Sequence, residues 1–71
     1  MKAILKFEIP EEREEFELAC NAVKYSIILS DMDYYLRNKI KHAELTDEQY
    51  KVYEEVRAQL WEYIQSEGIQ L

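Results

Sequence analysis

Apolar residues between positions 16 and 40 recur with the period of an α-helix. One stripe repeats every three or four residues, which is typical of one face of a helix; it contains Leu18, Ala22, Tyr25, Leu29, Met32, Leu36 and Ile40. A second stripe lies beside it and contains Phe16, Ala19, Cys20, Val23, Ile27 and Tyr34. A single neighbouring helix is too narrow to cover so wide a surface. The pattern therefore predicts a long helix that has more than one partner.

Charged residues mark the ends of this first helix. Pro10 suits a first helical turn, and the Glu residues at 11, 12, 14 and 15 favour the positive end of a helix. Lys39, Lys41 and His42 suit the negative end, so the helix is expected over about residues 11–43. Ser30 with Asp33 resembles a weak capping box, which indicates a kink near Ser30 as an alternative to a continuous helix.

A turn and a second helix follow. Thr46 and Gln49 have the spacing of a capping box, and Leu45 and Tyr50 are placed for a hydrophobic staple. The second helix is expected to run antiparallel to the first as far as about residue 66, with Gly68 in a left-handed conformation after it. Its predicted buried face contains Val52, Tyr53, Val56, Leu60, Tyr63 and Ile64.

Residues 2–9 alternate between apolar and polar side chains, which predicts a short N-terminal β-strand. A lone strand cannot satisfy its own backbone groups. It is expected to pair with a second copy of itself, to pair with residues 69–71, or to lie as an extended arm across the helices.

The two helices differ in length, about 50 Å against about 30 Å. The second helix therefore covers the first only back to about residue 24. A refolded N-terminal strand, a doubled-over first helix or a second copy of the chain would cover the remainder, and a second copy is the favoured solution. The predicted dimer interface contains Phe16, Leu18, Ala19, Cys20 and Val23. The expected fold is mainly α, a single small domain over residues 1–71 completed by homodimerisation.

Chain length and composition limit the cellular environment and the classes of partner that the protein is expected to have. A chain of 71 residues is near the lower limit for folding alone. Cys20 is the only cysteine, so no internal disulfide forms; it is expected to be a buried apolar residue in a reducing, cytoplasmic environment. No stretch has the length and apolarity of a membrane span. A net charge of −6 disfavours direct nucleic-acid binding.

The sequence offers little catalytic chemistry. One glycine and one histidine exclude a glycine-rich phosphate loop and a histidine-rich metal site, so neither cofactor nor metal is expected and the chain is predicted to be non-enzymatic. Glu14-x-x-Glu17 with Glu44-x-x-Asp47 resembles the carboxylate spacing of the MazG-type nucleotide pyrophosphohydrolases, which bind magnesium. Because Glu44 and Asp47 straddle the predicted turn, this enzyme remains a remote alternative.

Tyr50, Arg57 and Trp61 share one face of the second helix, and such aromatic-plus-arginine faces are enriched in binding hot spots. This face either packs within the dimer or binds another protein.

The layout Lys-x-x-Leu-x-Phe-x-x-Pro-Glu-Glu over residues 2–12, followed by Leu-x-Asp-x-Asp-x-x-Leu-Arg over residues 29–37, resembles small proteins of tailed phages and prophages of Gram-positive bacteria. The similarity covers most of the chain. These relatives have no assigned chemistry, so the resemblance implies a phage context and no functional residues. Small acidic phage proteins of this kind often bind host or phage proteins.

Two functions follow from these observations. The first is a helical homodimer that binds and modulates a host or phage protein in the cytoplasm of the infected or lysogenic host. The second is an acidic mimic of nucleic acid that inhibits a defence or DNA-binding enzyme, of the anti-restriction or anti-CRISPR type. It would use the six Glu residues between positions 8 and 17, which otherwise serve as a solvated helix start.

Overall fold

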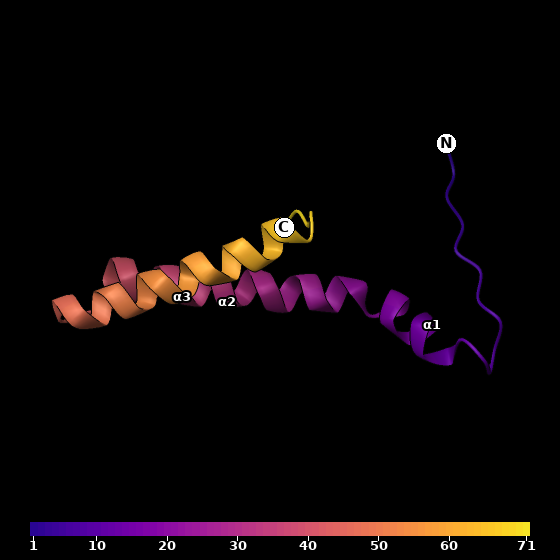
Figure 1. Cartoon of the computed structure of the whole chain (residues 1–71), viewed down its shortest axis with the longest axis horizontal. Coiled ribbons are helices and arrows are strands. Elements are labelled where there is room, and N and C mark those ends of the chain that lie inside the picture. The colour runs from indigo at the N-terminus through magenta and orange to yellow at the C-terminus, as the bar shows by residue number, and fades with distance from the viewer.

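The computed structural model describes all 71 residues and contains three helices, α1 (Arg13–Cys20), α2 (Ala22–His42) and α3 (Asp47–Ser66). Helices α2 and α3 lie side by side as an antiparallel hairpin, α1 extends beyond the end of α3, and the N-terminal arm stands away from the helices (Figure 1). The molecule measures 53 × 27 × 19 Å. The expected mainly helical class and the antiparallel second helix are confirmed.

The hairpin turn is fixed by the predicted capping box. The Gln49 N–H donates to the Thr46 hydroxyl oxygen at 3.2 Å, and the Thr46 N–H donates to the Gln49 side-chain oxygen at 3.0 Å. These two bonds satisfy backbone donors at the helix start that have no partner within the helix itself. They set the residue at which α3 begins.

Gly68 ends α3 in the predicted left-handed conformation, with φ of +68°. The Gly68 N–H donates to the Gln65 carbonyl at 3.0 Å, and the Ile69 N–H donates to the Ile64 carbonyl at 3.1 Å. This pair of bonds is a Schellman motif, which closes the carbonyl end of the helix.

The long helix expected over residues 11–43 is divided at Asn21. Asn21 has φ −95° and ψ 3°, outside ideal helical values, and α1 bends away from the axis of α2 at this residue (Figure 1). Asparagine is a poorer helix former than most of its neighbours. The kink considered near Ser30 is wrong, because α2 continues through Ser30 without interruption.

The predicted N-terminal strand is also wrong, because residues 1–8 form no strand and make no ladder bonds. The two chain ends lie apart in Figure 1, so residues 69–71 do not supply a partner. The arm is joined to α1 by a turn, in which the Glu8 N–H donates to the Glu12 carboxylate at 2.9 Å. The Phe7 ring also meets the Phe16 ring edge to face, with centroids 5.8 Å apart.

The buried core is small and lies between α2 and α3. Leu36 and Ile64 are its two buried side chains, with 4% and 3% of their surface exposed. Part of the predicted buried face of α3 is wrong, because Val52, Val56 and Tyr63 are exposed. The rest of the predicted face is confirmed, because Tyr53 and Leu60 are half-buried and Ile64 is buried, and the half-buried Arg57 lies on the same stripe.

Candidate protein-interaction surfaces

Asp33 on α2 joins the hairpin helices through a polar contact, here called the interhelical clamp. One carboxylate oxygen, Oδ1, accepts from Arg57 Nε at 2.8 Å and from Trp61 Nε1 at 2.6 Å. Arg57 and Trp61 are four residues apart, so one face of α3 presents both donors. The Asp33–Arg57 contact is the one ion pair in the chain. It replaces the within-helix pair that the spacing of Asp33 and Arg37 suggests.

The clamp changes the acidity of Asp33. The hydrogen bond from Arg57 is the main cause that holds the pKa of the Asp33 carboxyl below its ordinary value. Partial burial acts in the opposite direction and raises the pKa. The Trp61 hydrogen bond and the positive charges of Arg57 and Arg37 lower the pKa further. The ionised form is therefore the one that the folded hairpin stabilises.

The predicted partner-binding face is partly occupied by the clamp. Arg57 and Trp61 are half-buried, and each directs a nitrogen to Asp33, while Tyr50 is half-buried about two helical turns earlier. Beside the clamp, an open hollow of about 310 Å³ is lined by Ile40, Glu54, Arg57, Ala58 and Trp61. Arg57 and Trp61 therefore hold the hairpin together and also line the edge of this hollow.

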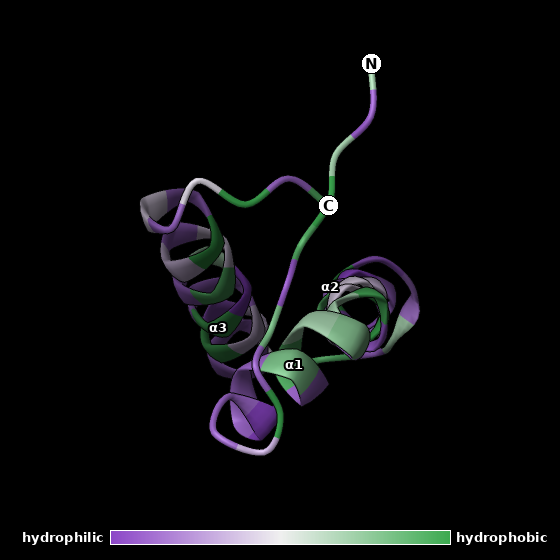
Figure 2. Cartoon of the chain, turned by 90° about the vertical axis from the view of Figure 1, so that its right-hand side faces the viewer, coloured by the Kyte–Doolittle hydropathy of each residue, from purple (hydrophilic) through white to green (hydrophobic).

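The predicted dimer interface is almost wholly uncovered within one chain. Phe16, Leu18 and Val23 are 42%, 57% and 70% exposed. Cys20 is also exposed, so the expectation of a buried thiol is not met within one chain, while Ala19 is half-buried. In Figure 2 the ribbon of α1 shows green, hydrophobic residues beside purple, hydrophilic ones.

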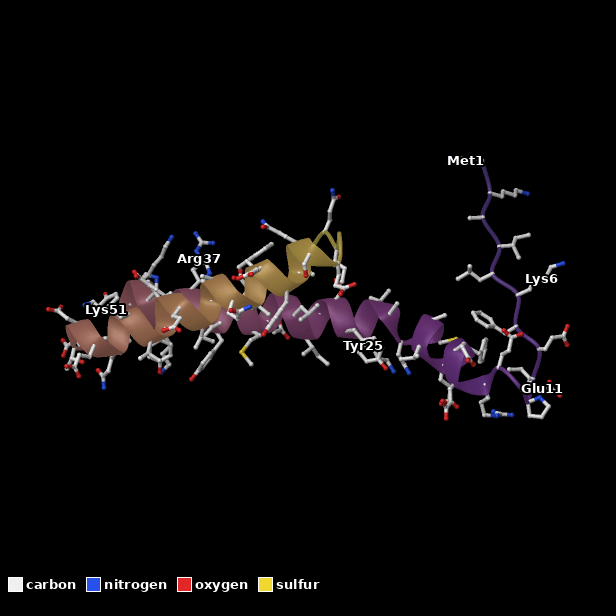
Figure 3. The ribbon with its side chains drawn as sticks, viewed as in Figure 1. Met1, Lys6, Glu11, Tyr25, Arg37 and Lys51 are labelled. Carbon is white, nitrogen blue, oxygen red and sulfur yellow. The ribbon has the colours of Figure 1, made fainter.

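A second apolar surface lies along one side of the hairpin and is called the hairpin face. It consists of six side chains that are 49–65% exposed, namely Ile28, Met32, Tyr35, Val52, Val56 and Tyr63. An open groove of about 330 Å³ runs between the two helices on this side; it is lined by Met32, Leu36, Val56, Gln59, Leu60 and Tyr63. In the view of Figure 3, the labelled Arg37 projects above the ribbon of α2 and the labelled Tyr25 below it.

The hairpin face was not predicted from the sequence, although part of its signal is present there. Ile28 and Tyr35 widen the apolar surface of the first helix beyond a single stripe. Val52, Val56 and Tyr63 of α3 are predicted to be buried but are exposed, while Arg57 of the same helix contacts Asp33 on α2.

The chain exposes far more surface than a compact domain of its mass. Its accessible area is 6589 Å², whereas a compact monomer of 8.6 kDa exposes about 4,700 Å². Its radius of gyration is 17.2 Å, against about 11 Å for a compact chain of this length. The N-terminal arm accounts for part of the excess, and the two apolar surfaces account for much of the rest.

The carboxylates of the remote enzymatic alternative do not converge within one chain. Glu14 and Glu17 lie on α1, and Glu44 and Asp47 lie beyond the far end of α2. Helix α2 has 21 residues, which separates the two pairs by about 30 Å. No group of three or more histidine, cysteine, aspartate or glutamate side chains is placed to hold a metal ion.

Comparisons with protein-family models, with curated proteins and with solved structures found no match. None of the three helices has the length and apolarity needed to cross a membrane.

Proposed function

We propose that this chain is a non-enzymatic interaction protein, a helical homodimer that binds and modulates a host or phage protein. The resemblance to small phage proteins supports a phage context, in which the protein acts in the cytoplasm of the infected or lysogenic host. The observation that carries the proposal is the large apolar area that one chain leaves uncovered, on the predicted dimer interface and on the hairpin face.

Two apolar surfaces on one small chain favour two different contacts. Soluble monomers seldom expose a contiguous apolar patch larger than a few hundred Å², and larger patches mark interaction sites. The surfaces lie on different parts of the molecule, the first on α1 and the start of α2 and the second along α2 and α3. One surface serves the second copy, and the other is free for a different protein.

The first test is the mass in solution, measured by light scattering over a range of protein concentrations. A homodimer has twice the mass of the 8.6 kDa chain. A chain that remains monomeric at every concentration contradicts the homodimer.

The second test is capture of a partner from host cells, using matched baits. The wild-type chain is compared with Tyr63→Glu, which places a charge on the hairpin face, and with Glu62→Gln, which changes a neighbouring exposed side chain. We expect a protein that binds the wild type and the Glu62 variant and is lost with the Tyr63 variant. Equal capture by all three baits contradicts binding through the hairpin face.

The acidic N-terminal segment supports a second candidate, a mimic of nucleic acid that inhibits a defence or DNA-binding enzyme. Five of its six Glu residues are exposed, and none forms an ion pair within the chain. Glu12 is half-buried and caps the Glu8 N–H. Binding that weakens steeply as salt is raised would favour this mimic, whereas binding that depends little on salt favours the apolar contact.

A further inference from the structure

Six positions on α1 and α2 form a regular stripe that α3 leaves uncovered. They are separated alternately by four and three residues, the spacing of a coiled-coil heptad; they are Phe16, Cys20, Val23, Ile27, Ser30 and Tyr34. All six are exposed. Ile27 lies half a turn around α2 from Leu36, the residue buried against α3. This stripe, called the heptad seam, is therefore accessible from the side opposite α3.

We propose that a second copy of the chain packs antiparallel along the heptad seam. The inference rests on the homodimer of the proposed function and specifies its geometry. It follows from the charges at the two ends of the seam, because Glu14 and Glu17 lie near its start and Arg37 and Lys41 lie beyond its end. A parallel pair places like charges together at both ends, whereas an antiparallel pair places each acidic end beside a basic end.

The charges beside the seam also select the register. Antiparallel heptad packing allows two registers that differ by seven residues. In the first register, Val23 meets the partner's Tyr34 and Ile27 meets the partner's Ser30, while Cys20 and Phe16 face the partner's Arg37 and Lys41. Lys24 then lies beside the partner's Asp31 on both sides of the two-fold axis. In the second register, Lys24 lies beside the partner's Lys24, and Glu17 lies beside the partner's Asp31. The second register brings like charges together, so the first is the one proposed.

The side chains needed for these contacts are free within one chain. Glu17, Lys24 and Asp31 are exposed, and the single intrachain ion pair involves other residues. Burial of surface on both copies is also in proportion. The excess area of about 1,900 Å² per chain relative to a compact monomer also includes the N-terminal arm and the hairpin face, so the seam supplies a part of it, and permanent dimers bury about 2,000–5,000 Å² in total. The hairpin face lies outside this contact.

A charge exchange tests the geometry directly. Lys24→Glu places two acidic groups together at each of two symmetric sites, and Asp31→Lys places two basic groups together. Each variant is expected to raise the dimer dissociation constant about tenfold, measured by analytical ultracentrifugation at low salt. The variant with both changes restores opposite charges across the interface, and its dissociation constant is expected to return to within about threefold of the wild type.

Restoration in the combined variant reports a contact between chains. Lys24 and Asp31 are seven residues apart, about 10 Å along one helix, so they do not pair within a chain. Lys51→Glu, an equivalent change on the exposed side of α3, is the matched control and is expected to leave the dissociation constant unchanged. Circular dichroism verifies that every variant retains its helices. The alkylation rate of Cys20 provides a second measurement, and it is expected to fall as the dimer forms.

The outcomes separate this inference from the proposed function. A wild-type chain that is monomeric throughout overturns both the homodimer and its geometry. A stable wild-type dimer without loss in the single variants, or without restoration in the combined variant, overturns only the geometry. A tighter dimer in Asp31→Lys alone assigns the second register, in which the new lysine lies beside the partner's Glu17, and also overturns the proposal.

Discussion

The hairpin and the N-terminal half of the chain both carry apolar side chains, but one chain buries them to different extents in the two regions. In the hairpin, residues from both helices bury Leu36 and Ile64, and the interhelical clamp satisfies polar groups at the edge of this core. In the N-terminal half, α1 and the start of α2 carry a comparable density of apolar side chains with no helix opposite them.

An amphipathic pattern alone does not distinguish a core from an interface. The stripe that contains Leu36 is covered because α3 has the length to reach it, whereas the stripe that contains Val23 lies beyond or behind α3. Chain length and helix register therefore decide which apolar residues one copy buries.

The largest expected effect is the loss of the hairpin core. Leu36→Ala removes one of two buried side chains and is expected to lower the free energy of unfolding by about 2–4 kcal/mol. Ile28→Ala, at a position 61% exposed in one chain, is the matched control and is expected to cost less than about 1 kcal/mol. Urea unfolding followed by circular dichroism measures both values. Equal costs would show that the assembled protein buries the hairpin face as deeply as the core.

The next effect concerns the clamp. Asp33→Asn keeps a side-chain oxygen for Trp61 but removes the charge that Arg57 contacts, and is expected to cost about 1–2 kcal/mol. Glu55→Gln on α3 is the control, because Glu55 is exposed and has no ion pair. Its cost is expected to be within about 0.5 kcal/mol of zero. A similar cost for both variants would exclude the clamp as a source of hairpin stability.

The clamp also predicts a pH dependence of known sign. The folded-state pKa of Asp33 lies below its ordinary value, so the clamp stabilises fully above about pH 4, the pKa of an unfolded aspartate. This contribution is lost as pH falls through the folded-state pKa. The stability difference between the wild type and Asp33→Asn should therefore shrink on acidification. A difference that stays constant down to pH 2 would contradict the pKa assignment.

A smaller effect is expected at the turn. Thr46→Ala removes the hydroxyl that accepts from the Gln49 N–H, and should cost about 1 kcal/mol. Thr46→Ser retains the hydroxyl and should change stability by only about 0.3 kcal/mol. Thermal unfolding at a single protein concentration compares the two. Equal losses would place the stabilising contact elsewhere in the turn.

The smallest effect has the opposite sign and concerns the junction between the two halves. Asn21→Ala places a strong helix former at the break and is expected to stabilise a continuous helix by about 0.5 kcal/mol. Helical content measured by circular dichroism should rise, while Asn38→Ala within α2 should change it little. No rise would assign the bend to packing, such as the Phe7–Phe16 contact, and not to the residue at the break.

Local signals were the most successful guide from sequence to structure. The Thr46–Gln49 capping box and the left-handed Gly68 depend on residues within three or four positions of one another, and both are confirmed. The break at Asn21 was missed because the chain stays close to helical there. Its N–H still donates to the Glu17 carbonyl, and its carbonyl accepts from the Tyr25 N–H. The apolar period therefore passes through Asn21 unchanged.

Features that depend on a distant partner were harder to predict. The alternation in residues 2–9 defines two faces of an extended chain but does not provide a neighbouring strand. The clamp had a usable signal, because Asp33 falls beside Leu36 on the covered side of α2 and Arg57 falls between Tyr53 and Leu60 on the covered side of α3. Opposite charges on two facing stripes, with helices joined near residue 45, indicate a cross-helix pair.

Trp61 gives the molecule a built-in optical probe. It is the only tryptophan in the chain, and its indole N–H is bonded to Asp33 across the hairpin. Its fluorescence is therefore sensitive to separation of α2 and α3, while α1 and the arm lie too far along the chain to affect it directly. An emission change on dilution would report opening of the hairpin itself. A dimer that dissociates into intact hairpins would leave the emission unchanged, which separates the loss of assembly from the loss of fold without any added label.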